Sequence, residues 1–446
     1  MSTWISGATA RISTQLPRLT RALRINSALI LNSGWLLLDK VLRIVISLVV
    51  GAWVARYLGP SSYGELMYVL ALIALFQSAA SLGLDGPLVR DIAQHPDRTD
   101  AILGSAFRLR LAAGVAAWIA ALGWITVLRP GDHAALVMMA LAGAALIFQP
   151  ADLVDLWFQS QHSSRTSIPY RIVAYCVVAA AKVALIVSSA PVWAFAAAAL
   201  LDAALVAGAM TFAYRRRPFN KRWLWDKAWA IRLVSDSWPL MLSAIAVGIY
   251  MRIDQVMLRE LASERELGLY SAILPFSQAW HMIPMVLCAS LLPPLAKLRA
   301  EGSPLYTRRL QQVFDLMAWL GIGVAGLTAL LAPWMVNLLL GAQYADAVPI
   351  LQWHAVSNVF IFLGVAQSLS IVTERAPRIA LVKTLFGVVV NVAANLALIP
   401  RWGALGAAFA ATITQCASAV LSNAIVAPGT FRMQIKSLLP IHVVRN

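Results

Sequence analysis

The most basic stretch of the chain is Arg215-Arg216-Arg217-Pro218-Phe219-Asn220-Lys221-Arg222, and long apolar stretches stand on both sides of it. The hydrocarbon of a bilayer is about 30 Å thick and strongly disfavours such a run of cations. The stretch therefore predicts a polar joint between two membrane-embedded parts. The apolar residues before and after it suffice for six membrane spans each, so this joint sets the predicted plan of the fold.

Composition indicates that most of the chain lies in lipid. Hydrophobic residues make up 60% of the 446 residues and charged residues 13%, whereas soluble domains average about 45–50% and about 25%. The mean hydropathy is +0.73, and a soluble core of this length cannot hide so much apolar surface. The formal net charge of +16 comes from Lys and Arg in short loops. These loops form no continuous basic surface, which argues against nucleic-acid binding.

Twelve apolar stretches are long enough to be membrane spans, because a helix needs about 20 residues to cross the hydrocarbon. Gly and Pro interrupt them at Leu58-Gly59-Pro60, Arg129-Pro130-Gly131, Pro191, Pro400 and Pro428. The sequence predicts an all-α polytopic membrane protein with two six-helix bundles that form a parallel pseudo-repeat. The predicted spans are 29–57, 63–84, 103–128, 134–156, 168–189, 192–214, 237–260, 267–295, 311–340, 347–373, 377–399 and 403–427.

The distribution of basic residues predicts the orientation. With the N-terminus in the cytoplasm, the great majority of the 36 Lys and Arg residues fall in cytoplasmic segments, as the positive-inside rule requires. Both termini are then cytoplasmic. The apolar run after the basic N-terminal segment is too long for a secretory signal. The predicted division is a basic segment 1–28, a bundle 29–214, a linker 215–236, a bundle 237–427 and a tail 428–446.

The two halves share landmarks at similar spacing. Trp35 and Tyr63-Gly64 in the first half correspond to Trp238 and Leu267-Gly268 in the second half. Each predicted half has an even number of spans, so the two copies would run in the same direction. An axis along the membrane normal would then relate them.

The chain lacks the motifs of an enzyme. It has no G-x-x-x-x-G-K-[ST] loop for ATP. Gly321, Gly323 and Gly326 match G-x-G-x-x-G, but they lie inside a predicted span, where close helix packing accounts for them. The three Cys lie in apolar stretches without a C-x-x-C pair, and the short predicted loops leave no room for an external catalytic domain. We therefore expect a carrier with no cofactor, no metal and no catalytic residues.

Charged residues inside the first and seventh spans are the leading candidates for a binding site, because each costs about 2.5–3.5 kcal/mol near a helix centre on insertion scales. Asp39, Lys40 and Arg43 lie in the first span. The spacing of Asp39 and Arg43 fits either a local ion pair or a cavity-lining pair. Arg252 lies about 21 Å into the seventh span at 1.5 Å per residue. Together with Asp254 it either faces a hydrated cavity or forms a structural salt bridge.

Lys182 and Asp202 lie at a similar depth in the fifth and sixth spans, where both a mutual ion pair and cavity positions are open. The embedded cations are at least as numerous as the clearly embedded acids. That balance suits an anionic group such as a pyrophosphate better than a lipophilic cation. The cations are Lys40, Arg43, Lys182 and Arg252, and the acids are Asp39, Asp202 and Asp254.

Further polar side chains are weaker candidates. Arg90 lies near a cytoplasmic span end, where water would satisfy it, and a lone His such as His281 is more often hydrogen-bonded than proton-coupled. Two Asn four residues apart are typical of contacts between helices. The set comprises Arg56, Arg90, Gln278, His281, Asn391 and Asn395.

Four stretches resemble the bacterial lipid-linked oligosaccharide flippases of the O-antigen and capsule (Wzx) type. They are residues 54–64, 250–258, 268–272 and 344–351, which include Arg56-Tyr57-Leu58-Gly59-Pro60 and Arg252-Ile253-Asp254-Gln255. These flippases belong to the multidrug/oligosaccharidyl-lipid/polysaccharide (MOP) superfamily, together with the multidrug-extrusion (MATE) carriers and the lipid II flippase. The similarity extends over all twelve predicted spans.

The resemblance implies an inner-membrane carrier with a MATE-like fold. It would move undecaprenyl-pyrophosphate-linked oligosaccharide units from the cytoplasmic to the periplasmic leaflet by alternating access, for O-antigen, capsule or exopolysaccharide synthesis. Arg252 and Asp254 match the seventh-span motif of the family, and Arg56 matches the end of its first span. Membrane lipid is a further implied partner, and a polysaccharide polymerase and a chain-length regulator are candidate protein partners.

Several alternatives remain open. A lipid II-type flippase would share the pyrophosphate chemistry, although the two additional spans found in some relatives are missing here. A cation-coupled multidrug or metabolite antiporter predicts a cavity dominated by acids. A major-facilitator permease predicts a Gly-x-x-x-Asp-Arg-x-Gly loop after the second span, where this chain reads Asp85-Gly86-Pro87-Leu88-Val89-Arg90-Asp91.

Overall fold

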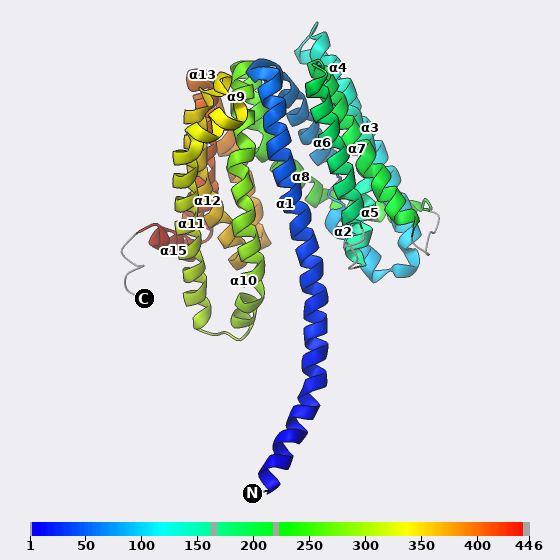
Figure 1. Cartoon of the computed structure of the whole chain (residues 1–446), viewed down its shortest axis with the longest axis vertical. Coiled ribbons are helices and arrows are strands. Elements are labelled where there is room, and N and C mark those ends of the chain that lie inside the picture. Colours follow the sequence, from blue (N-terminus) through cyan, green and yellow to red (C-terminus); the bar gives the residue numbers. More distant parts are fainter. Residues whose placement is uncertain (1, 162–166, 217–222, 440–446) are drawn as a thin grey trace.

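The computed structural model describes residues 2–161, 167–216 and 223–439, with side chains from Val41 onwards except at position 377. Within these ranges every regular element is helical, which confirms the all-α class. Ten helical stretches of the described chain are apolar and long enough to cross a bilayer. Figure 1 shows them gathered into two groups, with the long helix α1 running between them.

Two of the ten stretches are hairpins. Helix α1 (Ser2–Ala80) contains Gly59 at φ +74°, and helix α13 (Pro377–Cys416) contains Gly403 at φ +54°. Positive φ is open to Gly because it has no Cβ, and the chain turns back at both residues, as Figure 1 shows for α1. When each hairpin is counted as two crossings, the described chain has the twelve spans that the sequence predicts.

The remaining elements complete the spans and their connections. Outside the two hairpins, most spans are single helices: α3 (Thr99–Leu128), α6 (Ile168–Val187), α7 (Val192–Arg215), α8 (Lys227–Leu261), α11 (Leu305–Met335) and α12 (Ala347–Thr373). Helix α11 continues into the short element η5 (Val336–Leu340). Two spans are interrupted by a 3-10 segment. One consists of α4 (His133–Gly143), the 3-10 segment η2 (Ala144–Ala151) and α5 (Asp152–Ser160). The other consists of α9 (Glu264–Gln278), the 3-10 segment η4 (Ala279–His281) and α10 (Met282–Ala300). The short elements are α2 (Asp85–Gln94), η1 (Pro96–Arg98), η6 (Ala342–Tyr344), η7 (Ala417–Leu421), α14 (Asn423–Val426) and α15 (Pro428–Leu438).

Helix ends differ from the predicted span limits at several places, and two of these differences have a clear local cause. Pro400 lies inside α13, and the reversal comes at Gly403, because a Pro bends a helix but cannot supply positive φ. Helix α8 begins within the predicted linker, since the Asp226 carboxylate accepts hydrogen bonds from the backbone N–H groups of Ala228 (2.8 Å) and Trp229 (3.3 Å) and caps the helix. Residues 217–222 of the linker lie outside the described residues, and the division into bundles, linker and tail remains a prediction.

The Gly-x-Gly-x-x-Gly stretch of α11 packs closely at only one of its glycines. A Cβ on Gly321 would lie 2.9 Å from Cα of Val359 in α12. Gly323 and Gly326 have no neighbouring atom within 4 Å of such a Cβ. The expectation of close packing is therefore correct for Gly321 and wrong for the other two, because residues two and five positions along a helix face other directions.

The two halves of the chain, residues 2–216 and 223–439, meet at a reciprocal contact of glycines. A Cβ on Gly64 in α1 would lie 1.9 Å from the carbonyl oxygen of Glu264, and a Cβ on Gly268 in α9 would lie 1.8 Å from that of Pro60. Each glycine thus faces the residue four positions before its counterpart in the other half. A two-fold axis between repeats produces such a reciprocal contact, so the predicted landmarks Gly64 and Gly268 are the point where the repeats touch.

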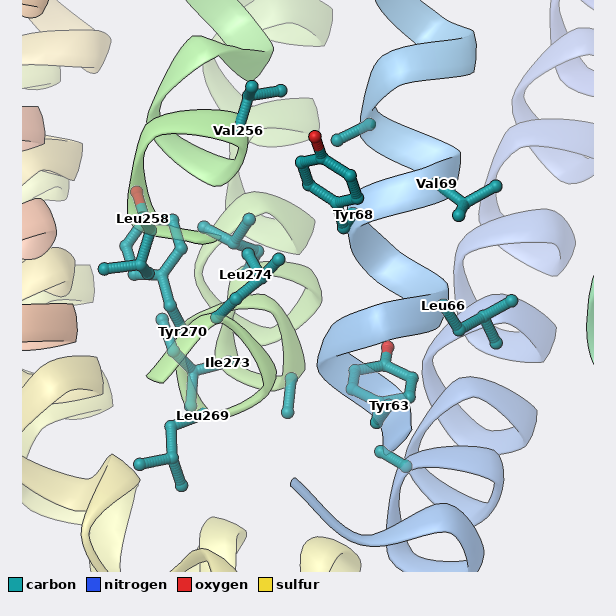
Figure 2. Packing of buried hydrophobic residues seen from close by; sticks show 14 of the residues in the cluster. Tyr63, Leu66, Tyr68, Val69, Val256, Leu258, Leu269, Tyr270, Ile273 and Leu274 are labelled. Carbon is teal, nitrogen blue, oxygen red and sulfur yellow. The ribbon is translucent and has the colours of Figure 1, made fainter. Parts of the chain in front are cut away.

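The largest core cluster surrounds this contact. It joins the second arm of α1, residues 60–80 after the turn at Gly59, to α8 and α9. Figure 2 shows Tyr63 and Tyr68 of α1 on one side and Leu258, Tyr270 and Ile273 on the other. All five are buried. We call this region the Gly59 end, because the turns at Gly59, Gly341 and Gly403 also lie here. The opposite region, where α2 and α5 lie, is the α2 end (Figure 1).

Large apolar side chains remain exposed along the outer faces of the helices. Val187, Leu330 and Ile425 are at least three-quarters exposed. A soluble protein hides such residues, whereas lipid tails accommodate them without cost. The exposed apolar surface supports the conclusion that this is a multi-pass membrane protein.

Gly268→Ala is expected to lower the melting temperature of the purified protein in detergent. The new Cβ would overlap the backbone at Pro60, so α1 and α9 must separate, at a cost of about 1–3 kcal/mol. Gly323→Ala is the matched control, because nothing lies within 4 Å of its Cβ and Ala favours a helix. Equal melting temperatures for the two variants would show that the glycine contact does not hold the halves together.

Candidate functional site

A cavity of about 650 Å³ lies between the two halves, and we call it the central cavity. The first half contributes residues of α1, α6 and α7, and the second half contributes residues of α8, α9 and η4. Helices α1 and α9 pack against each other at the Gly59 end, and the central cavity lies farther along these two helices. A carrier that changes the relative position of its halves would therefore change the walls of this cavity.

Cations outnumber acids in the wall of the central cavity. Among the described residues, Arg43, Lys182 and Arg252 line it, against the single carboxylate of Asp202. The guanidinium of Arg43 lies 5.0 Å from the ring centroid of Tyr175, a cation–π geometry that fixes its position. The side chains whose charges act on Asp202 are Lys182 and Arg43. Among the described residues, the central cavity therefore presents excess positive charge.

Three buried polar atoms at the cavity wall have no hydrogen-bond partner among the described residues. They are Asp202 Oδ1, Gln255 Nε2 and Ser271 Oγ. Gln255 and Ser271 are almost wholly buried. A buried polar group without a partner is costly, so these atoms are available to water or to a bound polar ligand. Together with the cations they supply both donors and an acceptor.

Six of the residues singled out from the sequence line the central cavity. The imidazole of His281 also lies 2.9 Å from the Asn358 side-chain oxygen, Nε2 to Oδ1. That contact gives His281 a hydrogen-bonding role at the cavity wall. The six residues are Arg43, Lys182, Asp202, Arg252, Gln278 and His281.

Asp254 does not line the central cavity. Its carboxylate accepts hydrogen bonds from the hydroxyl of Tyr270 (2.6 Å) and from the backbone N–H of Gln255 (2.8 Å), and it is buried between α8 and α9. Residues two apart on a helix point in nearly opposite directions. Arg252 and Asp254 therefore cannot both face the cavity, and the expectation of a joint cavity role is wrong for Asp254.

Four other predicted residues also lie away from the central cavity. Arg56 lies at the Gly59 end, where its guanidinium donates to the Leu338 carbonyl (3.4 Å). Arg90 pairs with Asp91 (2.9 Å) at the α2 end. Asn391 and Asn395 bond to each other along α13, from Asn395 Nδ2 to the Asn391 carbonyl (2.9 Å) and side chain (3.1 Å). The expected bond between helices is replaced by this contact within one helix.

The side chains of Asp39 and Lys40 lie outside the described residues. The proposed pairing of Asp39 with Arg43 is therefore still a prediction. Both residues directly precede the cavity-lining arm of α1.

Three uncharged polar residues of the wall were not singled out from the sequence, namely Gln255, Ser271 and Tyr175. One pattern identifies Gln255, because it follows Arg252 by three positions and so shares its helix face. Ser271 and Tyr175 carry no comparable pattern. Their contribution depends on how α6 and α9 rotate against α1.

Polar contacts between the halves close the Gly59 end above the cavity. The hydroxyl of Tyr68 donates to the Glu260 carboxylate (2.5 Å), and Arg129 bridges to the same carboxylate (3.2 Å). The Arg129 guanidinium also lies over the Tyr68 ring, 4.6 Å from its centroid. Tyr344 adds a hydrogen bond from its hydroxyl to the Ala55 carbonyl (2.9 Å). These contacts would have to break before the central cavity opened at this end.

Residues 29–299 match the profile of a protein family described as polysaccharide biosynthesis protein. The match covers more than half of the chain. The chain belongs to the polysaccharide biosynthesis protein family. Among curated proteins, no sequence matches it significantly.

Solved structures share the fold. The lipid II flippase MurJ in an inward closed conformation superposes with a TM-score of 0.71 at 12% identity, covering 93% of this chain and 92% of that chain. A multidrug resistance MATE family transporter of the MOP superfamily, in its inward-facing conformation, gives 0.68 at 16% identity, covering 88% and 95%. The family member described here therefore has the MATE-like fold that the sequence predicts. Those two structures are a flippase and a transporter by their own descriptions.

Tyr270→Phe is expected to destabilise the protein by about 1.5–3 kcal/mol, because it removes a hydrogen bond to the Asp254 carboxylate, which then loses a buried donor. Thermal melting in detergent measures the loss. Asp254→Asn keeps an acceptor oxygen for the Gln255 N–H, and its amide nitrogen can donate to the Tyr270 hydroxyl, so it should cost less. If Asp254→Asn is the more damaging variant, the negative charge of Asp254 has a role that this hydrogen bond does not explain.

Proposed function

We propose that the protein is a flippase for undecaprenyl-pyrophosphate-linked oligosaccharide units. It would move them from the cytoplasmic to the periplasmic leaflet of the bacterial inner membrane for polysaccharide synthesis. The observation that carries this proposal is the excess of cations in the central cavity, where Arg43, Lys182 and Arg252 face a single Asp202. A pyrophosphate complements such a wall, because hydrogen bonds between cationic side chains and phosphate oxygens are roughly twice as strong as those between neutral groups. The family description, polysaccharide biosynthesis protein, supports the same process.

The orientation follows from the positive-inside rule, which places the α2 end in the cytoplasm. The halves are joined at the Gly59 end, which would then face the periplasm. In this state the protein would receive its substrate from the cytoplasmic leaflet. Transport to the periplasmic leaflet requires the Tyr68–Glu260–Arg129 contacts to open and the halves to close at the α2 end.

Each cavity residue has a proposed role. Arg252 and Lys182 approach the pyrophosphate from opposite halves, and Arg43 completes the cationic wall from α1. The Gln255 amide nitrogen and the Ser271 hydroxyl, which can donate hydrogen bonds, would bind the remaining phosphate oxygens, whereas the Asp202 carboxylate, which can only accept, would bind a water molecule. Asp202 holds Lys182 and Arg43 by charge attraction, which prevents excessively tight binding and lets the substrate leave. Asp39 and Lys40, one turn before Arg43, remain proposed members of the site.

A lipid II-type substrate has the same pyrophosphate chemistry, so the cationic wall would accept it as well. A multidrug antiporter would handle lipophilic cations, which the excess of positive charge in the central cavity disfavours. Identification of the lipid that accumulates when the protein is missing distinguishes these functions.

Arg252→Ala and Lys182→Ala are each expected to reduce export about 10- to 100-fold, which corresponds to the loss of one charge-assisted contact. In a deletion strain carrying each variant, mass spectrometry with leaflet-selective labelling should find the completed lipid-linked glycan on the cytoplasmic face. Protein abundance is measured by immunoblot. Arg265→Ala is the matched control, because Arg265 forms an exposed salt bridge with Asp346 (2.7 Å) at the Gly59 end, and such pairs contribute little.

Normal export by both the Arg252→Ala and the Lys182→Ala variant would contradict the proposed pyrophosphate site. Accumulation of a peptidoglycan precursor lipid in the deletion strain would replace the proposed substrate with lipid II. An unchanged lipid pool combined with altered resistance to cationic dyes would favour the antiporter.

A further inference from the structure

A second cavity of about 530 Å³ adjoins the first on the side of the α2 end. Its walls come from the second arm of α1, from α2, α3, η2, α5 and α8, and Arg252 lines both cavities. The position follows from the chain: residues 63–70 of α1 line the central cavity, and residues 74–81 of the same arm line the second one. A ligand held at Arg252 could therefore extend from one cavity into the other.

The chemistry of the second cavity differs from that of the first. Its two cations, Arg110 and Arg252, are matched by two carboxylates, Asp85 and Asp152, among the described residues. The Arg110 guanidinium forms an ion pair with Asp85. Other polar residues of the wall are uncharged, and these are Gln77, Ser78, Ser81, Gln149 and Ser243. This wall offers no excess charge for an anion but many neutral hydrogen-bonding groups.

Two buried side chains of this wall keep polar atoms without partners among the described residues, namely Arg110 Nε and Gln149 Oε1. Arg110 is 1% exposed and Gln149 is 8% exposed. The remaining atoms of each side chain are fixed. Arg110 donates to Asp85 and to the Ser81 carbonyl (3.3 Å), and Gln149 Nε2 donates to the Gln77 carbonyl (3.3 Å). Two side chains that line this wall thus each keep one polar atom without a partner among the described residues, a donor on Arg110 and an acceptor on Gln149.

The backbone around Gln149 also departs from the regular helix. Gln149 lies in the 3-10 stretch η2, directly before Pro150, where the fourth span is interrupted. Interruptions of this kind at membrane depth are tolerated where they line a cavity, and they turn side chains away from their α-helical directions. The local structure therefore presents Gln149 to the second cavity.

We propose that the second cavity is the subsite for the sugars nearest the pyrophosphate of the lipid-linked glycan. This inference rests on the proposed function and adds the part of the site that binds the sugars. A sugar hydroxyl both donates and accepts a hydrogen bond, so it matches the free Arg110 Nε and Gln149 Oε1 together. The carboxylates of Asp85 and Asp152 and the neighbouring serines suit further hydroxyls. Arg252, common to both walls, contacts the pyrophosphate at the junction.

A binding experiment on the purified full-length protein in detergent tests this subsite. The two probes are undecaprenyl pyrophosphate, which carries no sugar, and the lipid-linked glycan extracted from the deletion strain. Gln149→Met preserves the shape of the side chain but removes its polar atoms. It should weaken binding of the glycan-bearing lipid about 3- to 10-fold, the value of one neutral hydrogen bond. Binding of the sugar-free lipid should not change.

Three further variants complete the design. Gln94→Met is the matched control, because Gln94 is exposed at the end of α2, and it should bind both lipids normally. Ser243→Ala, a smaller change in the α8 wall, should also weaken only the glycan-bearing lipid, and it carries the test if Gln149→Met does not fold. Lys182→Ala, in the central cavity, should weaken both lipids.

The outcomes separate this subsite from the pyrophosphate site. If a folded Gln149→Met or Ser243→Ala variant binds both lipids with unchanged affinity, or loses affinity for both equally, the sugar subsite is overturned and the pyrophosphate site is unaffected. Equal affinity of the unsubstituted protein for the two lipids also overturns it. If Lys182→Ala weakens neither lipid, or undecaprenyl pyrophosphate does not bind, the proposed function itself fails and the sugar subsite fails with it.

Discussion

Backbone contact between Gly64 and Gly268 is the constraint on which the rest of the structure depends. A side chain at either position would overlap the carbonyl of Pro60 or Glu264, so only glycine lets α1 and α9 approach this closely. In lipid, where the hydrophobic effect does not drive helices together, such close packing is a main source of association. The contact joins the two halves at one end and allows the central cavity to lie between them farther along the same helices.

The cavity can hold charge because of its position between the halves. Arg43, Lys182 and Arg252 come from three different helices, and none of them could stay in lipid without a polar environment. Two of these helices, α1 and α8, also carry contacts of the Gly59 end. A movement of the halves would therefore change the cavity wall and the Gly59 end together.

The two cavities differ in the charged and hydrogen-bonding groups that line them. The central cavity offers excess positive charge, and the second cavity offers balanced charge with fixed neutral donors and acceptors. A ligand with an anionic centre and a polyhydroxylated part would use both. Such an arrangement allows one part of the site to bind a common carrier group while the other discriminates between glycans, because specificity grows when buried polar groups are left unpaired by a wrong ligand.

Sequence alone determined the class of the protein, the number of its spans and three of the cations that line the central cavity. Composition requires a membrane protein, and a charge such as that of Lys182 within an apolar span is conspicuous because it is costly there. Only the tertiary structure decided which face each helix presents. It placed Arg252 on the cavity and Asp254 against Tyr270, and it brought Gln149 and Arg110 to one wall. The reason is that uncharged polar residues stand out little from an apolar sequence, and their role depends on helix rotation, which long-range packing fixes.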